Sequence, residues 1–366
     1  MKMSVVNNLG SAFETVEGEL DQPIGYEVHI TVKASGLCHS DLHIRDEGYG
    51  SPFPTLLGHE IAGIVENVGE LVTEFKKGDH VVGCLIQFCG HCQECLSGHT
   101  YLCEHPEYTL RTKDQKPRVK FKNSDQFLFQ QYGLGGFAGE ALVHQHQLAK
   151  VPDEIPFDKA CILGCSTVTG AGAIINTAHI RPGDSVAIIG TGGVGLNAIS
   201  GAKVAGATTI IAIDLVDEKL EFAKKFGATH TINSGKEDAI AKVREITNGG
   251  VNAAFEVIGL IPTAQQAIGM ARKGGGAYLI GLQKPKTEIP VPGFEGLIAQ
   301  NKKIEGVWMG STNLKHDIPM YAKMYLEGRM NLDDLVSETI SIDEVDDAFR
   351  RLKEGKVLGR SVITSF

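Results

Sequence analysis

The 366-residue sequence contains no apolar run of the length, about 18 residues, that a membrane-spanning helix requires. It also has fewer positive than negative charges: 35 lysines and arginines stand against 44 aspartates and glutamates, so the formal net charge is −9. This balance argues against a surface for nucleic acid or anionic membrane. The one basic stretch, KDQKPRVKFK at residues 113–122, carries no pattern of stacking aromatic residues, and we interpret it as a solvated loop.

The first residues, MKMSVVNNLG, lack the apolar core of a signal peptide, so we expect a cytoplasmic protein. Thiols stay reduced in that compartment, and the eight cysteines are expected to bind metal or to be buried rather than to form disulfides. The length favours two domains. The 44 glycines favour an α/β protein with many tight turns between strands and helices.

Half of the cysteines lie in fifteen residues, CGHCQECLSGHTYLC. Cys89, Cys92, Cys95 and Cys103 follow the pattern C-x2-C-x2-C-x7-C, and four thiolates saturate a tetrahedral Zn²⁺ with no open position. A bacterial ferredoxin-type iron–sulfur run would end in C-x3-C-P, and a zinc ribbon would use two separated pairs in a basic context. We therefore predict a structural zinc that orders this lobe.

Three further residues, Cys38, His59 and Cys165, offer two thiolates and one imidazole. Each alone is typical of a buried cysteine or an ordinary histidine. As a set they match the three protein ligands of a catalytic zinc, which keeps its fourth position open. Asp41 is the candidate partner for the second ring nitrogen of His59, and Glu60 directly follows the ligand and is placed to approach the metal.

The segment DSVAIIGTGGVGLNAISG indicates a buried strand, a glycine-rich turn and a helix. Gly190, Gly192 and Gly195 form G-x-G-x-x-G, which lets a dinucleotide pyrophosphate approach the backbone at a helix N-terminus. Asp214 ends the next predicted strand and is expected to bind the adenosine ribose and repel a 2′-phosphate, which favours NAD over NADP. Lys219 is placed to reach the same ribose edge. Further strand–helix repeats predict a six-stranded doubly wound sheet.

With both cysteine sets and the glycine turn on one chain, the sequence resembles the zinc-containing medium-chain alcohol dehydrogenases. The resemblance rests on GHE at residues 58–60, the four-cysteine lobe, GTGGVG and the distant cysteine in LGCSTVTG, and it covers nearly the whole chain. It implies an α/β fold with a GroES-like, mostly-β catalytic domain at residues 1–166 and 309–366. A Rossmann domain with a doubly wound parallel sheet is implied at residues 167–308.

The resemblance also implies roles for single residues. Ser40 matches the hydroxyl that bonds the substrate oxygen and begins a proton relay, and His43 matches the histidine that ends it. His39 matches the basic residue on the pyrophosphate, and Thr169 the threonine beside the nicotinamide ring. Arg360 matches the arginine that contacts both the cofactor phosphate and the glutamate after the ligand histidine. Further cofactor contacts are implied at Gly193, Val194 and Ile258.

By this resemblance the chain transfers a hydride between a primary alcohol or aldehyde, medium-chain or aryl, and NAD, with two Zn²⁺ per chain. Its partners are then a small-molecule substrate and a second copy of the chain. The long segment at residues 104–137 is similar to that of the dimeric branch, so we expect a homodimer joined through the Rossmann sheet, with a tetramer as the alternative. Leu85, Trp308 and Met309 are candidate walls of the substrate pocket.

Three alternatives remain at this stage. A formaldehyde dehydrogenase that oxidises a glutathione adduct would carry an arginine where Glu107 stands. Arg111 is the candidate to take the role of that arginine if the adduct is formed with another thiol. A nicotinoprotein would hold NAD tightly and pass electrons to an external acceptor. A non-catalytic relative is not expected, because it would have lost a ligand or a relay residue, and this chain keeps all of them.

Overall fold

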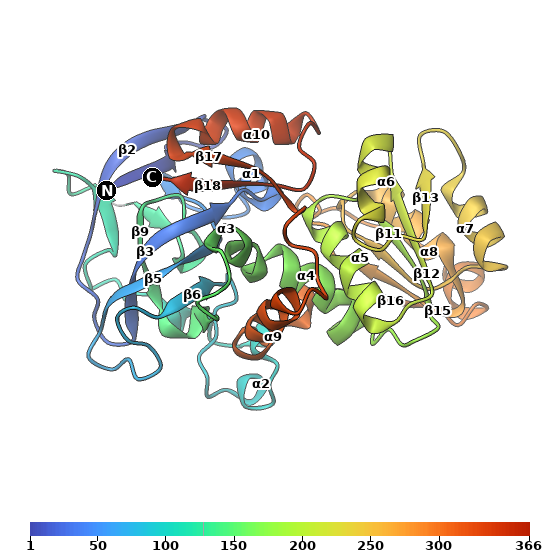
Figure 1. The fold of residues 1–366 in the computed structure, drawn as a ribbon, viewed down its shortest axis with the longest axis horizontal. Coiled ribbons are helices and arrows are strands. Elements are labelled where there is room, and N and C mark those ends of the chain that lie inside the picture. Colours follow the sequence, from blue (N-terminus) through green and yellow to red (C-terminus); the bar gives the residue numbers. More distant parts are fainter. Residues whose placement is uncertain (127) are drawn as a thin grey trace. The chain divides into compact units, whose positions relative to one another are not determined.

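The computed structural model describes residues 1–126 and 128–366, and Figure 1 labels its helices and strands. The described chain divides into two compact units. The first comprises Met1–Cys165, Asn313–Glu327 and Val336–Phe366, and the second Ser166–Thr312 and Gly328–Leu335. The predicted domain bounds differ from these at three points, the first of which is that the first segment ends at Cys165 and not at residue 166. The return to the first unit lies at residue 313 instead of 309, and Gly328–Leu335 lies with the second unit, where Asp334 pairs with Lys225 at 2.9 Å.

The first unit is built mainly from two sheets, with strand orders β7-β2-β1-β4-β8 and β10-β6-β5-β3-β18-β17, and β9 pairs with β3. The long central strand β3 (Glu27–Gly36) alternates β-branched and polar residues, which turns its apolar side chains inward, and it pairs with three strands, β5, β9 and β18. The other strands are β1 (Lys2–Val6), β2 (Phe13–Leu20), β4 (Thr55–Leu56), β5 (Glu60–Val68), β6 (His80–Gly83), β7 (Val119–Phe121), β8 (Phe129–Gln130), β9 (Glu140–His144), β10 (Leu148–Lys150), β17 (Val336–Ser341) and β18 (Arg360–Ser365).

Short helices close this unit. The helix α10 (Val345–Lys353) is buried on one stripe only, Val345, Ala348, Phe349 and Leu352, the spacing that places side chains on one helix face. Phe349 stacks on Phe13 of β2 with ring centroids 4.6 Å apart, which anchors the helix to the sheet. The other helices are α1 (His39–Glu47), α2 (Gln93–Leu96), α3 (Phe157–Ala160), α9 (Leu314–Leu326), η1 (Thr100–Leu102), η2 (Pro106–Thr109), η3 (Gln131–Gly133), η4 (Gln145–Gln147), η5 (Cys161–Gly164) and η9 (Ile342–Glu344).

The second unit is a parallel sheet of order β13-β12-β11-β14-β15-β16, flanked by α5 to α8 (Figure 1). This order is that of a doubly wound Rossmann sheet and confirms the prediction. The strands are β11 (Ser185–Ile189), β12 (Thr209–Asp214), β13 (His230–Asn233), β14 (Val251–Glu256), β15 (Ala271–Leu279) and β16 (Lys303–Gly306). The helices are α4 (Ser166–Gly172), η6 (Ala173–Thr177), α5 (Gly193–Ala205), α6 (Asp217–Lys224), α7 (Ala239–Thr247), α8 (Ile261–Met270), η7 (Gly293–Ile298) and η8 (Met309–Ser311).

The strand order decides where this unit can bind a ligand. The chain runs outward from β11 through β12 to β13, and then returns to the other side of β11 with β14. The direction of winding therefore reverses at β11, and the crevice outside the carboxyl ends of β11, β12 and β14 is the place where such sheets bind ligands. Gly190, Asp214 and Glu256 lie at those three strand ends.

Within the described residues, no single helix is long and apolar enough to cross a membrane. One bent pair of helices, Phe157–Gly164 followed by Ser166–Thr177, meets that test by length and composition only.

Candidate functional site

Asp41 organises the first group of predicted site residues. Cys38 caps the N-terminus of α1, and Asp41 in its first turn accepts a hydrogen bond from the Cys38 backbone N–H at 3.3 Å. The other carboxylate oxygen of Asp41 lies 3.1 Å from His59 Nδ1 and accepts the Gly58 N–H at 3.2 Å. Gly58 has φ +93° and a Cβ there would lie 2.5 Å from the Phe137 nitrogen, so only glycine permits this turn. The helix start thereby fixes the imidazole that precedes β5.

Four predicted residues from three distant segments meet beside this turn. Ligand atoms of Cys38, His59, Glu60 and Cys165 all lie within 4.8 Å of one another, and all four residues are buried. His59 Nδ1 is held by Asp41, whereas its Nε2 is buried with no hydrogen-bond partner among the described residues. An imidazole nitrogen fixed in this way, next to two thiols, fits a zinc ion that takes two sulfur ligands and one nitrogen.

The ionisable groups of this cluster shift one another's pKa values. A hydrogen bond from Cys165, with the nearby Arg360 and His59, lowers the pKa of Cys38 well below its usual value. The same interaction with Cys38, together with burial, raises the pKa of Cys165. Burial opposes a charge on His59, but Asp41 and Cys38 outweigh it and raise the His59 pKa.

Glu60 and Arg360 form an ion pair behind the cluster. The Arg360 guanidinium donates to Glu60 at 2.8 Å and lies 3.5 Å from Cys38 Sγ, and both charged residues are almost fully buried. Burial raises the pKa of Glu60 to about 7 although Arg360 acts in the opposite direction. The structure therefore places Arg360 in the cysteine–histidine cluster, and its contact with a cofactor phosphate stays a prediction.

The remaining polar residues predicted for α1 lie on its first two turns. Ser40 Oγ lies 3.0 Å from Cys38 Sγ, so its hydroxyl borders the cluster. His43 is half-buried, one turn further along, and its ring contacts that of Tyr49 edge-on at 6.2 Å. His39 is exposed. The helix thus presents a hydroxyl at the cluster and an imidazole nearer to its surface.

The second cysteine set forms a compact lobe. Cys89, Cys92, Cys95 and Cys103 place their sulfurs within 4.8 Å of one another, with two Sγ pairs 4.0 Å apart. A tetrahedral ion with zinc–sulfur bonds of about 2.3 Å requires sulfurs about 3.8 Å apart, so the set fits. Backbone N–H groups point at the sulfurs, for example the Cys89 nitrogen at 3.2 Å from Cys103 Sγ and the Cys92 nitrogen at 3.3 Å from Cys89 Sγ.

Two of the lobe thiols respond oppositely to their surroundings. Backbone N–H groups of Glu104 and Cys95 lower the pKa of Cys92 to about 6. Burial raises the pKa of Cys95 to about 12, and the neighbouring sulfurs of Cys92 and Cys103 act in the same direction because they disfavour a further negative charge. Four thiolates so close together repel one another unless a cation lies among them.

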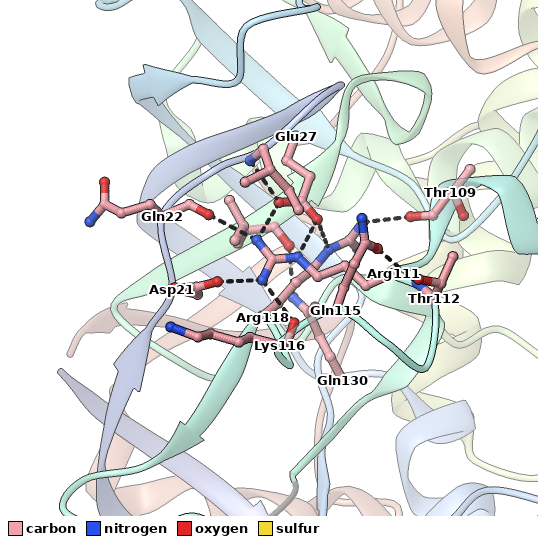
Figure 2. A network of polar contacts seen from close by, with 12 residues as sticks. Asp21, Gln22, Glu27, Thr109, Arg111, Thr112, Gln115, Lys116, Arg118 and Gln130 are labelled. Atoms are coloured by element: carbon pink, nitrogen blue, oxygen red, sulfur yellow. Dashed lines mark hydrogen bonds and ion pairs between the residues drawn. The ribbon is translucent and has the colours of Figure 1, made fainter.

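A charged network fastens the segment after the lobe to β3 (Figure 2). The buried Glu27 carboxylate accepts from Arg111 at 2.8 and 2.6 Å and from Arg118 at 2.7 Å. Arg111 also pairs with Asp21 at 2.6 Å, and Arg118 donates to the Thr109 carbonyl at 2.6 Å. The bonds from Arg111 and Arg118 to the two carboxylates connect residues 84 to 91 positions apart in the sequence.

The network bears on the glutathione-adduct alternative. Only 7% of the Arg111 side chain is exposed, and its guanidinium is already paired with two carboxylates. These pairs occupy the Arg111 guanidinium and argue against its suggested role in holding the carboxylate of a thiol substrate, which stays a prediction. Glu107, at the position where an arginine would be needed, carries the opposite charge.

The glycine turn between β11 and α5 has the geometry of a phosphate cradle. Gly190 has φ +102°, and a Cβ at Gly195 would lie 1.9 Å from the Gly190 carbonyl oxygen. A Cβ at Gly192 would meet nothing within 4 Å, so this part of the turn faces open space. No side chain caps the helix here, and the N–H groups of Gly193 and Val194 start it. The turn therefore offers backbone donors to a dinucleotide pyrophosphate.

Asp214 has a role that the sequence did not suggest. Its carboxylate accepts from the Thr191 backbone and hydroxyl at 2.9 and 2.8 Å, and from the Leu215 and Val216 nitrogens at 2.8 and 3.2 Å. Four donors use the lone pairs that a carboxylate offers, so Asp214 locks the glycine turn to the end of β12. Its ribose contact, and that of the half-buried Lys219 on α6, stay predictions.

Thr169 lies in α4 and is buried, with its hydroxyl 3.5 Å from Met309 Sδ. Ile258 follows β14 and is 41% exposed although it is apolar. Of the predicted pocket walls, Leu85 is buried after β6 and Trp308 is 49% exposed. The roles of these residues toward a substrate or cofactor stay predictions.

Sequence reasoning missed Tyr132. Its ring lies edge-on to His59 with centroids 5.9 Å apart, and its backbone is left-handed at φ +53°. Burial raises the pKa of its hydroxyl. No spacing or motif marks this tyrosine, because 73 residues separate it from His59 and only the fold joins them.

Comparisons with known proteins agree with this geometry. The family described as "Alcohol dehydrogenase GroES-like domain" matches residues 25–153, and "Zinc-binding dehydrogenase" matches residues 193–327. A putative alcohol dehydrogenase D of Mycobacterium tuberculosis is 37% identical over 357 residues, 96% of each chain. An NDMA-dependent alcohol dehydrogenase of Amycolatopsis methanolica is 36% identical over 359 residues, 97% of this chain and 96% of that one. The structure of benzyl alcohol dehydrogenase from Acinetobacter calcoaceticus is similar with a TM-score of 0.93 at 34% identity, covering 100% and 99% of the two chains.

Proposed function

Because the chain belongs to the zinc-containing medium-chain alcohol dehydrogenases, we propose that it interconverts primary alcohols and aldehydes with NAD and two zinc ions per chain. Zinc-dependent alcohol oxidoreduction is the activity of the family, and the chain is an oxidoreductase of this type. The buried cluster of Cys38, His59 and Cys165, with the unpartnered His59 Nε2, is the observation that supports the finer proposal most directly.

In this proposal the two cysteine sets have different tasks. Cys38, His59 and Cys165 would hold the catalytic zinc, three protein ligands being the number typical of a catalytic site. Asp41 orients the ligand imidazole, and Glu60 borders the same ion. The four lobe cysteines would hold a second ion, and a set of four protein ligands suits a structural role.

The chain's own residues then move the proton. Oxidation of an alcohol removes a hydride from the carbinol carbon and a proton from the hydroxyl. When bound, zinc supplies Lewis acidity toward the alcohol oxygen and NAD supplies the hydride acceptor. Ser40, 3.0 Å from Cys38 Sγ, takes the hydroxyl proton, and His43 on the next turn of α1 passes it toward solvent.

For the cofactor, the turn Gly190–Gly195 binds the pyrophosphate through backbone donors. Asp214 disfavours a 2′-phosphate by its charge at the end of β12, which supports NAD over NADP. We further propose that His39 and Arg360 contact the phosphates, that Thr169 lies beside the nicotinamide ring, and that Lys219 and Ile258 border the adenosine half.

We propose medium-chain or aryl primary alcohols as substrates and a homodimer as the assembly. The similarity to a benzyl alcohol dehydrogenase supports the aryl class. The similarity to an NDMA-dependent alcohol dehydrogenase supports a second candidate, in which NAD stays bound and an external acceptor recycles it. The two differ only in whether added NAD sustains turnover.

The test is a panel of alcohols and aldehydes assayed by NADH absorbance, with and without the artificial acceptor NDMA. We expect turnover of benzyl alcohol and unbranched alcohols with added NAD, and metal analysis should find about two zinc ions per chain. Turnover only with the acceptor would select the second candidate. A chain with one zinc and no oxidation of any alcohol would contradict the proposal.

A further inference from the structure

Glu256 is a fully buried acid at the carboxyl end of β14 that no step above uses. Its Oε1 accepts three hydrogen bonds, from the Ile258 nitrogen at 2.8 Å, the Gly259 nitrogen at 2.7 Å and the Thr263 hydroxyl at 2.8 Å. Its Oε2 is buried with no hydrogen-bond partner among the described residues. The side chain therefore turns back upon the loop that follows its own strand.

That loop is packed directly against the glycine turn. A Cβ at Gly190 would lie 2.8 Å from Ile258 Cγ1 and 2.9 Å from Val257 Cγ2. On its other side, a Cβ at Gly259 would lie 2.4 Å from the Leu282 carbonyl oxygen. The Val257 nitrogen also donates to the Ile189 carbonyl at 3.1 Å. These contacts hold the loop Val257–Leu260 between the glycine turn and the segment after β15.

What this arrangement holds in place is exposed and apolar. Ile258 is 41% exposed and Leu260 is 55% exposed. A buried acid without full hydrogen bonding lowers the stability of the fold. The exposed apolar loop that it holds compensates for little of this loss. Binding and catalytic groups are commonly carried by loops that a rigid scaffold positions, and this loop lies at the strand ends where the sheet binds its ligand.

We propose that Glu256 is a positioning residue of the dinucleotide site: its carboxylate holds the Val257–Leu260 loop against the Gly190 turn and so presents Ile258 to the cofactor. The inference rests on the proposed NAD site and deepens it. Asp214 and Glu256 then act as a pair, since the half-buried Asp214 carboxylate locks one loop of the cradle through Thr191 and the fully buried Glu256 carboxylate locks the other through Ile258 and Gly259.

The experiment compares Glu256→Leu, Glu256→Asp and Glu256→Gln with the unmodified chain. NADH binding is measured by fluorescence titration, and unfolding is measured without cofactor. Leu removes the acceptor and Asp withdraws it by one methylene, so both variants should bind NADH about tenfold more weakly. Gln keeps the accepting oxygen and should stay within about threefold of the original affinity. The KM for NAD should rise, whereas kcat, measured at saturating NAD, should be retained.

Thr229→Val is the matched control. The Thr229 hydroxyl bonds the Ile210 backbone in the same sheet, at the end remote from the glycine turn. Its loss should lower the melting temperature without changing NADH affinity. If Glu256→Leu does not fold, Glu256→Asp carries the test.

Unchanged NADH affinity in a folded Glu256→Asp or Glu256→Leu chain would overturn the inference. So would a loss of affinity in Thr229→Val as large as in the Glu256 variants, because the effect would then follow stability alone. If the unmodified chain does not bind NADH at all, the NAD proposal itself fails, and that result is distinct from either of these.

Discussion

The two cysteine clusters are made from similar atoms but are assembled in different ways. The lobe takes four thiols from fifteen consecutive residues, whereas the second cluster takes its ligands from residues 38, 59 and 165. In the lobe the short loop itself brings the sulfurs together. In the other, a helix N-terminus, a glycine turn and a bend between two helices must all be in place first. A local cluster can fold with its ion, and a distributed one is formed by the finished fold.

The largest expected effect comes from breaking the distributed cluster. Cys165→Ser should remove one zinc ion and lower kcat at least about a thousandfold, because the alcohol loses its Lewis acid. The melting temperature should change little, since the other site residues are held by Asp41 and Arg360. Metal analysis, kinetics and thermal unfolding check this together, and retained turnover would contradict the ligand assignment.

Breaking the local cluster should have the opposite profile. Cys95→Ser should lose the other zinc ion and lower the free energy of unfolding by about 4 kcal/mol or more, or about 10 °C in melting temperature. The kcat of the chains that remain folded should change far less than in Cys165→Ser. An unaltered melting profile would show that the lobe does not depend on its ion.

A third change tests where the local lobe ends and long-range anchoring begins. Glu27→Gln removes the charge that pairs with Arg111 and Arg118 (Figure 2) and should cost about 3–5 kcal/mol, because the buried Arg118 guanidinium loses its counter-ion and Arg111 is left with Asp21. Glu19→Gln on β2 is the control, since both side chains of its pair with Lys120 are 41% exposed. It should cost no more than about 1 kcal/mol by denaturant unfolding. Equal costs would contradict a buried network.

The smallest expected effect concerns His144, the last residue of β9, and its neighbour His146 in η4. His144 accepts the His146 N–H at 3.1 Å, and burial, with the neighbouring His146 and Arg118, lowers its pKa from 6.5 to about 3. Because the unfolded chain binds this proton first, the stabilisation is complete above pH 6.5 and is lost as the pH falls toward 3.

From pH 7 to pH 5, His144 should therefore cost the fold about 2 kcal/mol. His144→Asn keeps an acceptor for His146 but does not titrate, so its unfolding free energy should fall less over the same interval. The difference between the two unfolding curves measures the contribution. Parallel pH dependence of both chains would contradict the assignment.

How much the sequence foretold depended on the distance over which each feature acts. The lobe spacing, the glycine turn and the strand–helix alternation are local patterns, and the structure has all three. The points near residues 312–336 where the chain passes between the two compact units are not local patterns, because contacts such as Lys225 with Asp334, which composition does not encode, decide to which unit a segment belongs. The same holds for Arg111, whose partners Glu27 and Asp21 lie more than 80 residues away in the sequence.

The sequence by itself determined the ligand types, the glycine pattern and the periodicity of the two units, because thiols, glycines and apolar spacing express short-range chemistry. Only the tertiary structure decided which carboxylates serve as locks, that Tyr132 adjoins His59, and that Glu256 closes the loop beside Gly190. Hydrogen bonds and ring contacts act over a few ångströms, and residues far apart in the chain come within that range only when the folded backbone brings them there.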